Sequence, residues 1–359
     1  MRIAINTGGG DAPGLNAVIR AASLSALNLG WEVVGIRRGY HGLFQEDGLV
    51  SLTRASVRGI THTGGTILGT TNRGNPLKWP VEGPDGEIQL VDRSEEVVSE
   101  FKRRGLDALI AIGGDGSLRI AAKLSEKGLP VVGVPKTIDN DLAATQVTFG
   151  FHTAVETATD AISKLHSTAE AHSRVMVVEV MGRGTGWIAL FAGMAGTADV
   201  ILIPEIPYRL DNVCRKIDER YEGDLGFAIV VAAEGAFPEG GDPVLAERGG
   251  AGKTERLGGI AERLAHEIGQ RTGRETRSLA LRHLQRGGQP NAYDRLLALR
   301  FGAAAVKLVR DGCFGCMVAL DPPKVLAVPL AEAVTDIKRV PLDGDVVQTA
   351  RSLGISFGD

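Results

Sequence analysis

The sequence contains little cysteine, almost no net charge and no long apolar run, and each of these shortages excludes a class of protein. Its three cysteines form an odd, low count that is typical of a reducing compartment, so we expect a cytoplasmic protein. Lysine and arginine number 40 against 43 acidic residues, so the overall field does not attract nucleic acid or a membrane surface. No apolar run reaches the roughly 18 residues that a membrane-spanning helix needs.

Two of the cysteines stand at the spacing of half a zinc site. They are Cys313 and Cys316, while Cys214 lies far away in the sequence. Structural zinc sites take four ligands, and no second cysteine pair exists to complete the set. We therefore expect these thiols to be buried or unused rather than bound to a metal.

The length and composition are those of an ordinary folded protein. Residues 1–5 run directly into a glycine turn, which indicates a first strand rather than a signal peptide. A chain of 359 residues is predicted to form two domains. Hydrophobic residues make up 43% of it and charged residues 23%, which favours large folded cores over disorder.

Short apolar runs alternate with amphipathic segments along the chain. The runs predicted as strands are residues 3–6, 32–37, 106–112, 130–134, 175–180, 200–203 and 228–233. The segments predicted as helices are residues 16–29, 94–104, 117–127 and 185–195. This alternation indicates βαβ units, so we expect an α/β protein with mostly parallel sheets covered by helices. Two segments rich in proline and glycine, residues 78–88 and 238–253, are predicted to be mobile surface loops.

Three glycine-rich segments each follow a predicted strand. The first, residues 8–14, precedes a helix, and its backbone N–H groups and the helix N-terminus can hold phosphate. A tight strand-to-helix turn explains this segment equally well. The second, residues 112–117, carries Asp115 between glycines, a position suited to Mg²⁺, with an Asp-Gly turn as the alternative.

The third segment, residues 135–141, places two carboxylates and a threonine directly after an apolar strand. Asp139 can take a proton from a hydroxyl group as a general base. Asn140 or Asp141 can instead cap a following helix, and for Asp141 this alternative is a strong one. Because ligands bind beyond the carboxyl ends of strands in open α/β sheets, the three loops can converge on one crevice.

Several arginines stand beside glycines. The planar guanidinium group suits phosphate oxygens, although a single arginine is usually a solvated surface residue. The arginines of this kind are Arg73, Arg174, Arg183, Arg277 and Arg286. Such local clusters, rather than the overall charge, are expected to hold an anionic substrate.

Together these segments resemble the phosphofructokinase family. The matching stretches include Gly-Gly-Asp-Ala-Pro-Gly-Leu-Asn-Ala at 9–17, Gly-Gly-Asp-Gly-Ser at 113–117, Pro-Lys-Thr-Ile-Asp-Asn-Asp at 135–141 and Gln-Arg-Gly-Gly at 285–288. Others are found at 64–70, 178–183, 273–277 and 293–295. They occur in the family's order over nearly the whole chain, so their combination is specific although each piece alone is not.

The resemblance implies transfer of a phosphoryl group to the 1-hydroxyl of fructose 6-phosphate, with Asp139 as general base and Asp115 as the Mg²⁺ ligand. The residues implied in catalysis are Asp139, Thr137, Arg73 and Gly10. The residues implied in donor binding are Gly10, Tyr40, Arg73, Gly114, Asp115, Gly116, Ser117 and Lys136. The residues implied in sugar-phosphate binding are Thr137, Asp139, Arg174, Met181, Gly182, Arg183, Glu234, Arg277, His283 and Arg286.

The resemblance also implies an architecture of two three-layer α/β domains. Residues 1–150 with 285–335 would bind the phosphoryl donor, and residues 151–284 with 336–359 would bind the sugar phosphate. Two of the arginines, Arg174 and Arg277, would reach the sugar phosphate of a neighbouring subunit. We therefore expect a homodimer or a homotetramer.

The phosphoryl donor depends on two positions. In the family a glycine at position 116 accompanies ATP, because an aspartate there obstructs and repels the α-phosphate. A lysine at position 136 accompanies pyrophosphate, although some ATP-using members combine the two residues as this chain does. We expect ATP on the steric argument, with pyrophosphate as the alternative donor.

Some positions depart from the family pattern. Gly184, Thr185 and Arg282 replace the residues that are usual near the sugar site. Residues 222–226 lack the basic cluster of allosterically regulated members, and Leu24 replaces an arginine. We therefore expect weak or absent regulation by ADP and phosphoenolpyruvate.

Two further alternatives belong to other classes. A lipid or NAD kinase also carries Gly-Gly-Asp-Gly, but the segments at 135–141 and 273–288 argue against it. A non-catalytic sensor of sugar phosphates or nucleotides is the other alternative. The presence of both Asp115 and Asp139 argues against an inactive site.

Overall fold

The computed structural model describes residues 1–71, 74–83, 85–222, 226–247 and 256–359. The chain divides into two compact units, which we call unit 1 and unit 2. Unit 1 consists of Met1–Thr137, Asp141–His152 and Arg286–Ile337, and unit 2 of Ile138–Asn140, Thr153–Gln285 and Lys338–Asp359.

Unit 1 is built on a mixed sheet with strand order β15-β14-β7-β6-β1-β2-β3. In this order the strands are Lys324–Pro329, Cys316–Asp321, Val131–Pro135, Ala108–Gly113, Arg2–Thr7, Glu32–Ile36 and Leu49–Ser51. The five central strands run parallel, and β15 and β3 are antiparallel to their neighbours. The carboxyl ends of β1, β6 and β7 therefore lie at one edge of the sheet.

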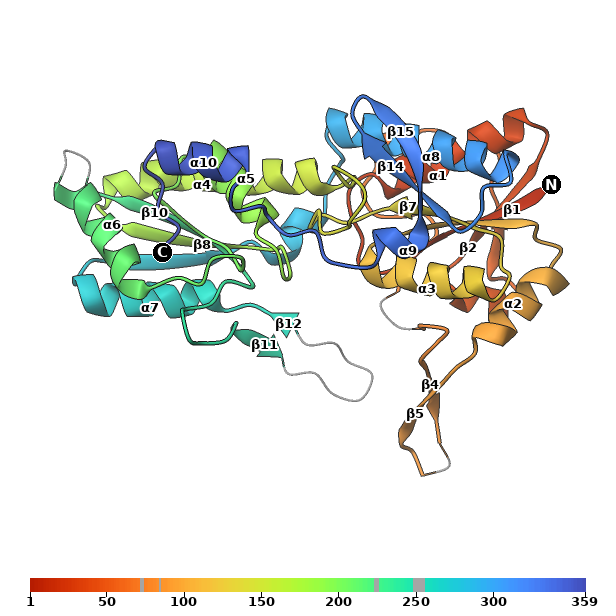
Figure 1. The fold of residues 1–359 in the computed structure, drawn as a ribbon, viewed down its shortest axis with the longest axis horizontal. Coiled ribbons are helices and arrows are strands. Elements are labelled where there is room, and N and C mark those ends of the chain that lie inside the picture. The colour runs from red at the N-terminus through yellow and green to blue at the C-terminus, as the bar shows by residue number, and fades with distance from the viewer. Residues whose placement is uncertain (72–73, 84, 223–225, 248–255) are drawn as a thin grey trace. The chain divides into compact units, whose positions relative to one another are not determined.

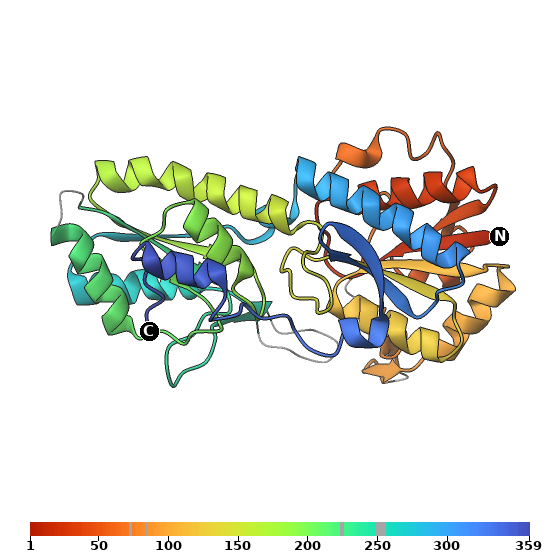
Figure 2. The same cartoon turned by 45° about the horizontal axis from the view of Figure 1, so that its top comes forward.

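Helices cover both faces of this sheet because successive side chains of each strand point to opposite sides. Ile3 and Ile5 pack with α1 (Leu15–Asn28) and α8 (Ala292–Arg310) on one face. Ala4 between them packs with the other face, which is covered by α2 (Ser94–Arg103), α3 (Asp115–Glu126) and α9 (Leu330–Ala333). Figures 1 and 2 show these two layers of helices on either side of the strands.

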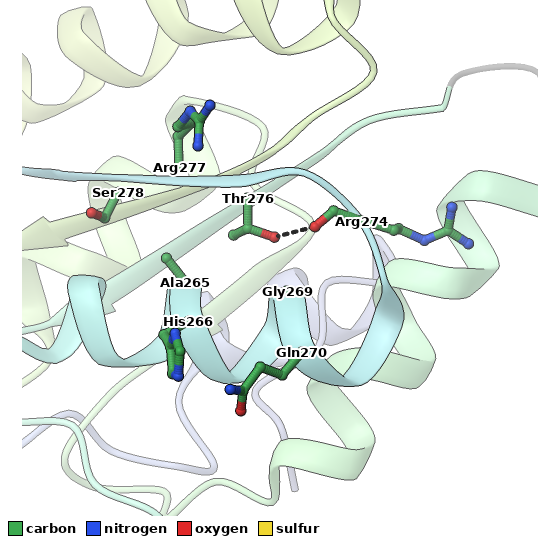
Figure 3. Close-up of a pocket in the computed structure, with 8 residues that line it drawn as sticks. All are labelled: Ala265, His266, Gly269, Gln270, Arg274, Thr276, Arg277 and Ser278. Carbon is green, nitrogen blue, oxygen red and sulfur yellow. Dashed lines mark hydrogen bonds between the residues drawn. The ribbon is translucent and has the colours of Figure 1, made fainter.

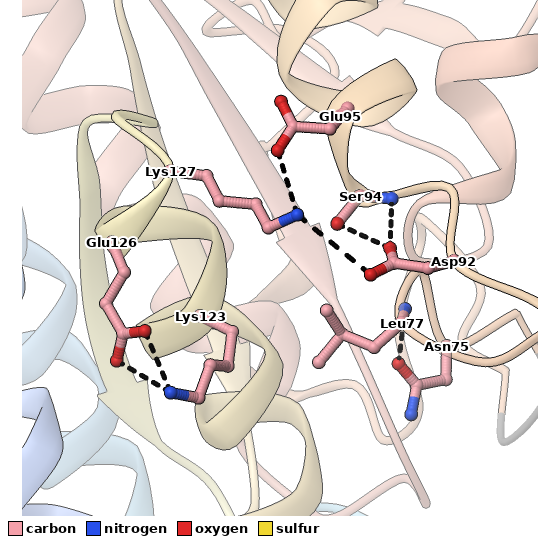
Figure 4. A network of polar contacts seen from close by, with 8 residues as sticks. All are labelled: Asn75, Leu77, Asp92, Ser94, Glu95, Lys123, Glu126 and Lys127. Carbon is pink, nitrogen blue, oxygen red and sulfur yellow. Dashed lines mark hydrogen bonds and ion pairs between the residues drawn. The ribbon is translucent and has the colours of Figure 1, made fainter.

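Polar contacts join α2 to α3 at the surface of unit 1 (Figure 4). The Asp92 carboxylate accepts hydrogen bonds from the backbone N–H and the hydroxyl of Ser94, so it holds the first turn of α2. These hydrogen bonds lower the pKa of Asp92 below its usual value. Lys127, which follows α3, contacts Glu95 of α2 at 2.9 Å. Because these groups are exposed, the pairs orient the helices more than they stabilise the fold.

The expectation of two mobile surface loops is wrong for the first of them. Residues 78–88 contribute to an antiparallel hairpin of β4 (Trp79–Glu82) and β5 (Ile88–Val91), which extends from unit 1 in Figure 1. Trp79 anchors it, because its ring lies 4.3 Å from that of His41 and packs against Phe44. Pro80 is tolerated because both strands of a two-stranded ribbon are edges.

The second predicted loop also contains a strand. Within residues 238–253 lies β11 (Leu245–Glu247), which pairs with β12 (Arg256–Leu257) just beyond this segment. Residues 248–253 of that loop lie outside the described residues.

Unit 2 is built on a parallel sheet with strand order β13-β8-β10-β9. In this order the strands are Thr276–Ala280, Val175–Val180, Ala228–Ala233 and Val200–Leu202. Helices α6 (Leu210–Glu222) and α7 (Ile260–Thr272) pack on one face. Figures 1 and 2 show α4 (Phe151–Ala171), α5 (Trp187–Ala195) and α10 (Asp345–Ser352) on the other face.

A buried carboxylate ties this sheet to α7. Glu179 of β8 accepts hydrogen bonds from the backbone N–H groups of Gly259 and Ala261, at 2.9 and 3.1 Å. The first N–H groups of a helix have no partner within the helix, so Glu179 satisfies donors that would otherwise be buried unpaired. It thereby holds the beginning of α7 against the sheet.

The prediction of an α/β protein with mostly parallel sheets is confirmed. The helix expected at 117–127 begins earlier, at Asp115, and the helix expected at 185–195 begins later, at Trp187. The earlier start places Asp115 in the first turn of α3. In the described part of the chain, no helix is long and apolar enough to cross a membrane.

Candidate functional site

The three glycine-rich loops of the sequence lie together at the carboxyl edge of the unit 1 sheet. The backbone N–H of Gly8, after β1, donates to the carbonyl of Ile112 in β6 at 2.9 Å. The N–H of Lys136, after β7, donates to the carbonyl of Gly113 at 2.9 Å. Backbone hydrogen bonds therefore join the loops side by side, as expected from the parallel order of their strands.

Glycines occur in these loops because the backbone passes close to the side chain of Ser117. A Cβ atom on Gly113 would lie 2.3 Å from Cβ of Ser117, and one on Gly8 would lie 2.7 Å from the Ser117 hydroxyl oxygen. Such contacts are far shorter than van der Waals distance, so only glycine fits without a shift of α3. Backbone N–H groups are consequently concentrated beside the N-terminus of α3, where the helix dipole favours an anion.

Lys136 places a positive charge among these loops. Its side chain is only 3% exposed, and its Nζ donates a hydrogen bond to the carbonyl oxygen of Gly10. Nζ also lies 3.6 Å from the position of a Cβ on Gly9. A lysine ammonium held inside glycine loops is suited to a phosphate oxygen.

Asp115 offers a carboxylate in the first turn of α3. Its side chain is largely buried, and its Oδ1 accepts a hydrogen bond from Nε of Arg119, one turn later, at 2.8 Å. Mg²⁺ is usually held by one or two carboxylates together with substrate phosphates and water. The described residues contain no group of three or more histidine, cysteine or acidic side chains that could enclose a metal. One carboxylate beside phosphate-suited loops therefore fits magnesium shared with a phosphate ligand.

Gly116, which follows Asp115 in α3, faces open space. Among the described residues, no heavy atom outside the local helix backbone lies within 4 Å of the position of its Cβ. The neighbouring Ser117, by contrast, is packed against Gly8 and Gly113. A ligand can therefore approach α3 over Gly116 without meeting protein atoms.

The other residues predicted to contact the phosphoryl donor lie in different environments. Thr137 lies beside Gly114, with 3.7 Å between its Cβ and the position of a Cβ on that glycine. The aromatic ring of Tyr40 is buried in the unit 1 core, and burial raises the pKa of its hydroxyl group, which is hydrogen-bonded to Asn6. Arg73 lies outside the described residues.

Arg286 belongs to unit 1 and lies against the first glycine loop. Its Nη1 donates to the backbone carbonyl of Asp11 at 3.1 Å and stands 3.0 Å from the position of a Cβ on Gly10. The family resemblance places this arginine among the residues that bind the sugar phosphate. Its guanidinium group lies where it can also approach a phosphoryl group bound by that loop.

In unit 2, Asp139 is joined to the loop that follows β8. Asp139 is 6% exposed, and the hydroxyl of Thr185 lies 3.2 Å from its backbone carbonyl oxygen. The same hydroxyl lies 3.1 Å from the carbonyl oxygen of Gly182, and the Thr185 N–H donates to that oxygen at 3.0 Å. Thr185 is fully buried, so these contacts hold the Asp139 backbone against the loop.

The same loop gathers other sugar-site candidates. The N–H of Arg183 donates to the Glu234 carboxylate at 3.0 Å, and the N–H of Met181 donates to Oε1 of Gln285 at 3.3 Å. Arg183 adopts a left-handed backbone with φ of 54°, which turns the loop sharply. His283 lies in the exposed part of the short helix Arg282–Arg286.

Arg174 and Arg277 lie together on the surface of unit 2. Both contact the Glu275 carboxylate, at 2.9 and 2.7 Å, and these contacts, Arg174 first, lower the pKa of Glu275. Arg277 also lines an open pocket of about 570 Å³ between α7 and β13. Figure 3 shows His266 and Gln270 on α7 beside this strand. Arg174 and Arg277 together form a positive surface patch suited to an anion.

The departures from the family pattern have distinct surroundings. Thr185 is the buried contact of Asp139, and next to it, apart from the two chain neighbours, no side chain of the described residues lies within 4 Å of the position of a Cβ on Gly184. Arg282 has a φ of 45° and lies 4.0 Å from the carboxylate of Glu262. Of the segment that was expected to lack an effector cluster, residues 223–225 lie outside the described residues.

Three residues organise the site although they are not among the predicted site residues; Thr185 is known from the sequence only as a departure from the family pattern and Gln285 only as part of a family motif. The three are Arg119, which contacts Asp115; Thr185, which contacts Asp139; and Gln285, which is fully buried and contacts the N–H of Met181. Each acts through a contact with a functional residue. Of these three contacts, only the one between Asp115 and Arg119 could be predicted from the sequence, because the two residues are about one helical turn apart.

Comparison with known proteins identifies the family. A profile described as Phosphofructokinase matches residues 2–309. The ATP-dependent 6-phosphofructokinase of Chloroflexus aurantiacus is 52% identical over 100% of this chain and 98% of its own length. The pyrophosphate–fructose 6-phosphate 1-phosphotransferase of Amycolatopsis methanolica is 51% identical over 95% of this chain and 96% of its own length.

A solved structure supports the fold. The pyrophosphate-dependent phosphofructokinase of Nitrosospira multiformis superposes with a TM-score of 0.81 at 22% identity, over 100% of this chain and 92% of that protein. The full-length matches in sequence agree with the bonded glycine loops and with the two α/β units. The chain therefore belongs to the phosphofructokinase family.

Proposed function

We propose that this protein is a cytoplasmic 6-phosphofructokinase that transfers the terminal phosphoryl group of ATP, with Mg²⁺, to the 1-hydroxyl of fructose 6-phosphate. The observation that carries the proposal is the bonding of three glycine loops at one edge of the unit 1 sheet, with Lys136 among them and Asp115 beside them. Phosphoryl transfer needs positioning and charge stabilisation above all, and this edge supplies both.

The choice of donor rests on Gly116. Named relatives of nearly equal identity use different donors, so similarity does not decide between ATP and pyrophosphate. The open space at Gly116 supports ATP, because a nucleotide needs room for its α-phosphate beyond the transferred group. Lys136 can bind phosphate of either donor, so it does not oppose this choice.

A two-donor assay tests the proposal. The purified protein with fructose 6-phosphate and Mg²⁺ is expected to form fructose 1,6-bisphosphate rapidly with ATP and slowly or not at all with pyrophosphate. Product formation is measured under identical conditions for each donor. Activity with pyrophosphate alone would reverse the donor choice, and inactivity with both donors would contradict the proposed reaction.

The residues of unit 1 would bind and orient the donor. The backbone around Gly10 and Gly114 and the N-terminus of α3 would hold its phosphates, with Lys136 supplying a charge. Asp115 would hold Mg²⁺, which neutralises charge on the phosphates when bound. Thr137 and Arg73 would contact the transferring group. These donor-site assignments, with Tyr40 near the nucleoside, remain predictions.

Asp139 would act as general base. A carboxylate can accept the proton of the 1-hydroxyl as that oxygen attacks phosphorus, which contributes about 10²–10⁴-fold to the rate. Asp139 is the second residue after Thr137 in the chain, so the base and the donor loop are linked by short backbone. Thr185 would act as a positioning residue, because its hydroxyl contacts the Asp139 carbonyl group.

Unit 2 would bind the sugar phosphate. The assigned residues are Met181, Gly182, Arg183, Glu234 and His283, together with Arg286 of unit 1. Arg174 and Arg277 would serve the site of a neighbouring subunit in a homodimer or homotetramer. Arg277 is exposed and Arg174 is partly exposed beside Glu275, which supports this assignment, because an arginine pair at the surface can meet an anion of another chain.

Replacing Thr185 by valine is expected to lower kcat by about fivefold while changing KM little, since a buried hydrogen bond of about 1 kcal/mol would be lost at the base. Thr185→Ser keeps the hydroxyl and is expected to restore most of kcat. Steady-state kinetics of both variants, with circular dichroism to verify folding, provide the measurement. A rise in KM with unchanged kcat would show that Thr185 serves substrate binding instead.

A further inference from the structure

A pair of thiols in unit 1 takes no part in the proposed reaction. Cys313 lies in the turn that follows α8, Cys316 is the first residue of β14, and their Sγ atoms are 3.1 Å apart. Both side chains are partly exposed, whereas Cys214 is buried in unit 2. A small reagent in solution can therefore reach the pair.

The backbone holds the two cysteines in place. The N–H of Cys313 donates to the carbonyl of Leu308 at 2.9 Å, so the turn is attached to the end of α8. The N–H of Gly315 donates to Val131 at 2.8 Å, and its carbonyl accepts from Leu330 at 2.8 Å. Gly315 has a φ of 72°, a conformation that other residues rarely adopt, and it permits this tight turn.

The geometry favours a bond between the two sulfurs. A disulfide requires an S–S distance of about 2.05 Å, so the Sγ atoms need to approach by only about 1 Å. Because the turn is already ordered, little conformational entropy is lost on closure. The intramolecular reaction therefore has an advantage over bonding to a second molecule.

A metal is a poor fit to the same pair. Structural zinc takes four nitrogen or sulfur ligands. Nowhere in the described ranges do three or more histidine, cysteine or acidic side chains gather to hold a metal ion. Two adjacent thiols that bind no metal can be oxidised to a disulfide.

We propose that Cys313 and Cys316 form a thiol–disulfide exchange site for small-molecule disulfides such as oxidised glutathione. A protein thiolate attacks one sulfur of the reagent, the S–S bond of the reagent breaks, and one glutathione thiolate leaves. The second cysteine, after losing its proton, attacks the protein sulfur of this mixed disulfide and releases the second glutathione. Two protein thiols are oxidised, one disulfide is reduced, and the two protons pass to the released thiolates.

The order of attack follows from the surroundings of the sulfurs. Burial raises the pKa of the Cys316 thiol to about 11, so it is rarely ionised near neutral pH. The thiolate is the nucleophile in such exchange. Cys313 is therefore the first to attack and Cys316 is the resolving residue, and the overall rate rises with pH.

The position of the pair separates it from the donor loops. Cys316 lies opposite Val132 near the beginning of β7, and β7 ends at Pro135, directly before Lys136. Cys316 therefore lies beside the beginning of β7, whereas the third glycine loop follows the end of β7. Oxidation is expected to leave phosphofructokinase turnover unchanged, and its test does not depend on the proposed function.

The experiment uses the full-length protein incubated with oxidised glutathione, quenched with acid and analysed by intact mass and peptide mapping. The wild-type protein is expected to lose two hydrogen atoms in mass and two of its thiols, with the bond mapped to Cys313 and Cys316. Cys214→Ser, the matched control, is expected to form the same bond.

The single variants separate the two steps. Cys316→Ser is expected to stop at a mixed disulfide with one glutathione on Cys313, and Cys313→Ser is expected to react far more slowly. Persistence of all three thiols in the wild-type protein, a stable mixed disulfide there, or a bond between two chains would overturn the proposal. Dithiothreitol is expected to restore the original mass.

Discussion

The Asp139→Asn variant is expected to fold and to bind fructose 6-phosphate, but to lose about 10²-fold or more in kcat. Asparagine has nearly the size of aspartate, so the buried position, 6% exposed, stays filled. Its amide cannot accept the proton of the 1-hydroxyl. Because the loss affects the chemical step, KM for the sugar phosphate is expected to change little.

Steady-state kinetics with ATP and fructose 6-phosphate provide the measurement, and calorimetric titration checks sugar binding separately. Asp160→Asn is a suitable control, because Asp160 is an exposed residue of α4 that contacts only Lys164 among the ion pairs of the described chain. That variant is expected to keep wild-type kcat. An unchanged kcat in Asp139→Asn would remove Asp139 as the base.

The second large effect is expected for Gly116→Asp, which should suppress the use of ATP much more than the use of pyrophosphate. A carboxylate about 4 Å from a phosphate oxygen repels it by about 1–4 kcal/mol, depending on the local dielectric, which corresponds to about 5–10³-fold in kcat/KM. The variant should fold, since the Cβ position is open and an acidic residue suits the first turn of a helix.

The comparison is the ratio of kcat/KM for ATP to kcat/KM for pyrophosphate in the wild-type protein and in the variant. Gly116→Ala introduces a side chain without charge and is the matched control, expected to retain most of its activity with ATP. If Gly116→Asp used ATP as well as the wild-type protein does, the nucleotide would not pass over this residue and the steric basis of the donor choice would be lost.

The convergence of the three glycine loops could be predicted from the sequence. Apolar runs at 3–6, 106–112 and 130–134 predicted parallel strands, and β1, β6 and β7 occupy these positions. Because parallel strands end at the same edge, the convergence of the loops after them followed from connectivity alone. The backbone bonds of Gly8 and Lys136 confirm that convergence.

The hairpin of β4 and β5 differs from the loop that the sequence predicts. Proline and glycine within residues 78–88 are typical of a loop, but Trp79 packs against His41, which is far away in sequence. This contact and the cross-strand pairing outweigh the local preference. Local composition does not record such a contact, so the hairpin could not be predicted from it.

The sequence by itself determined the α/β class, the order of the loops and the chemical types of the groups at their ends, because strand periodicity and chain direction are local properties. The contact of Arg119 with Asp115 follows from helical spacing, but only the tertiary structure decided that Arg286 lies on the first glycine loop and that Thr185 holds the Asp139 backbone. The last two contacts join residues that are distant in the chain. Side-chain packing between separate elements brings such residues together, and no local pattern encodes it.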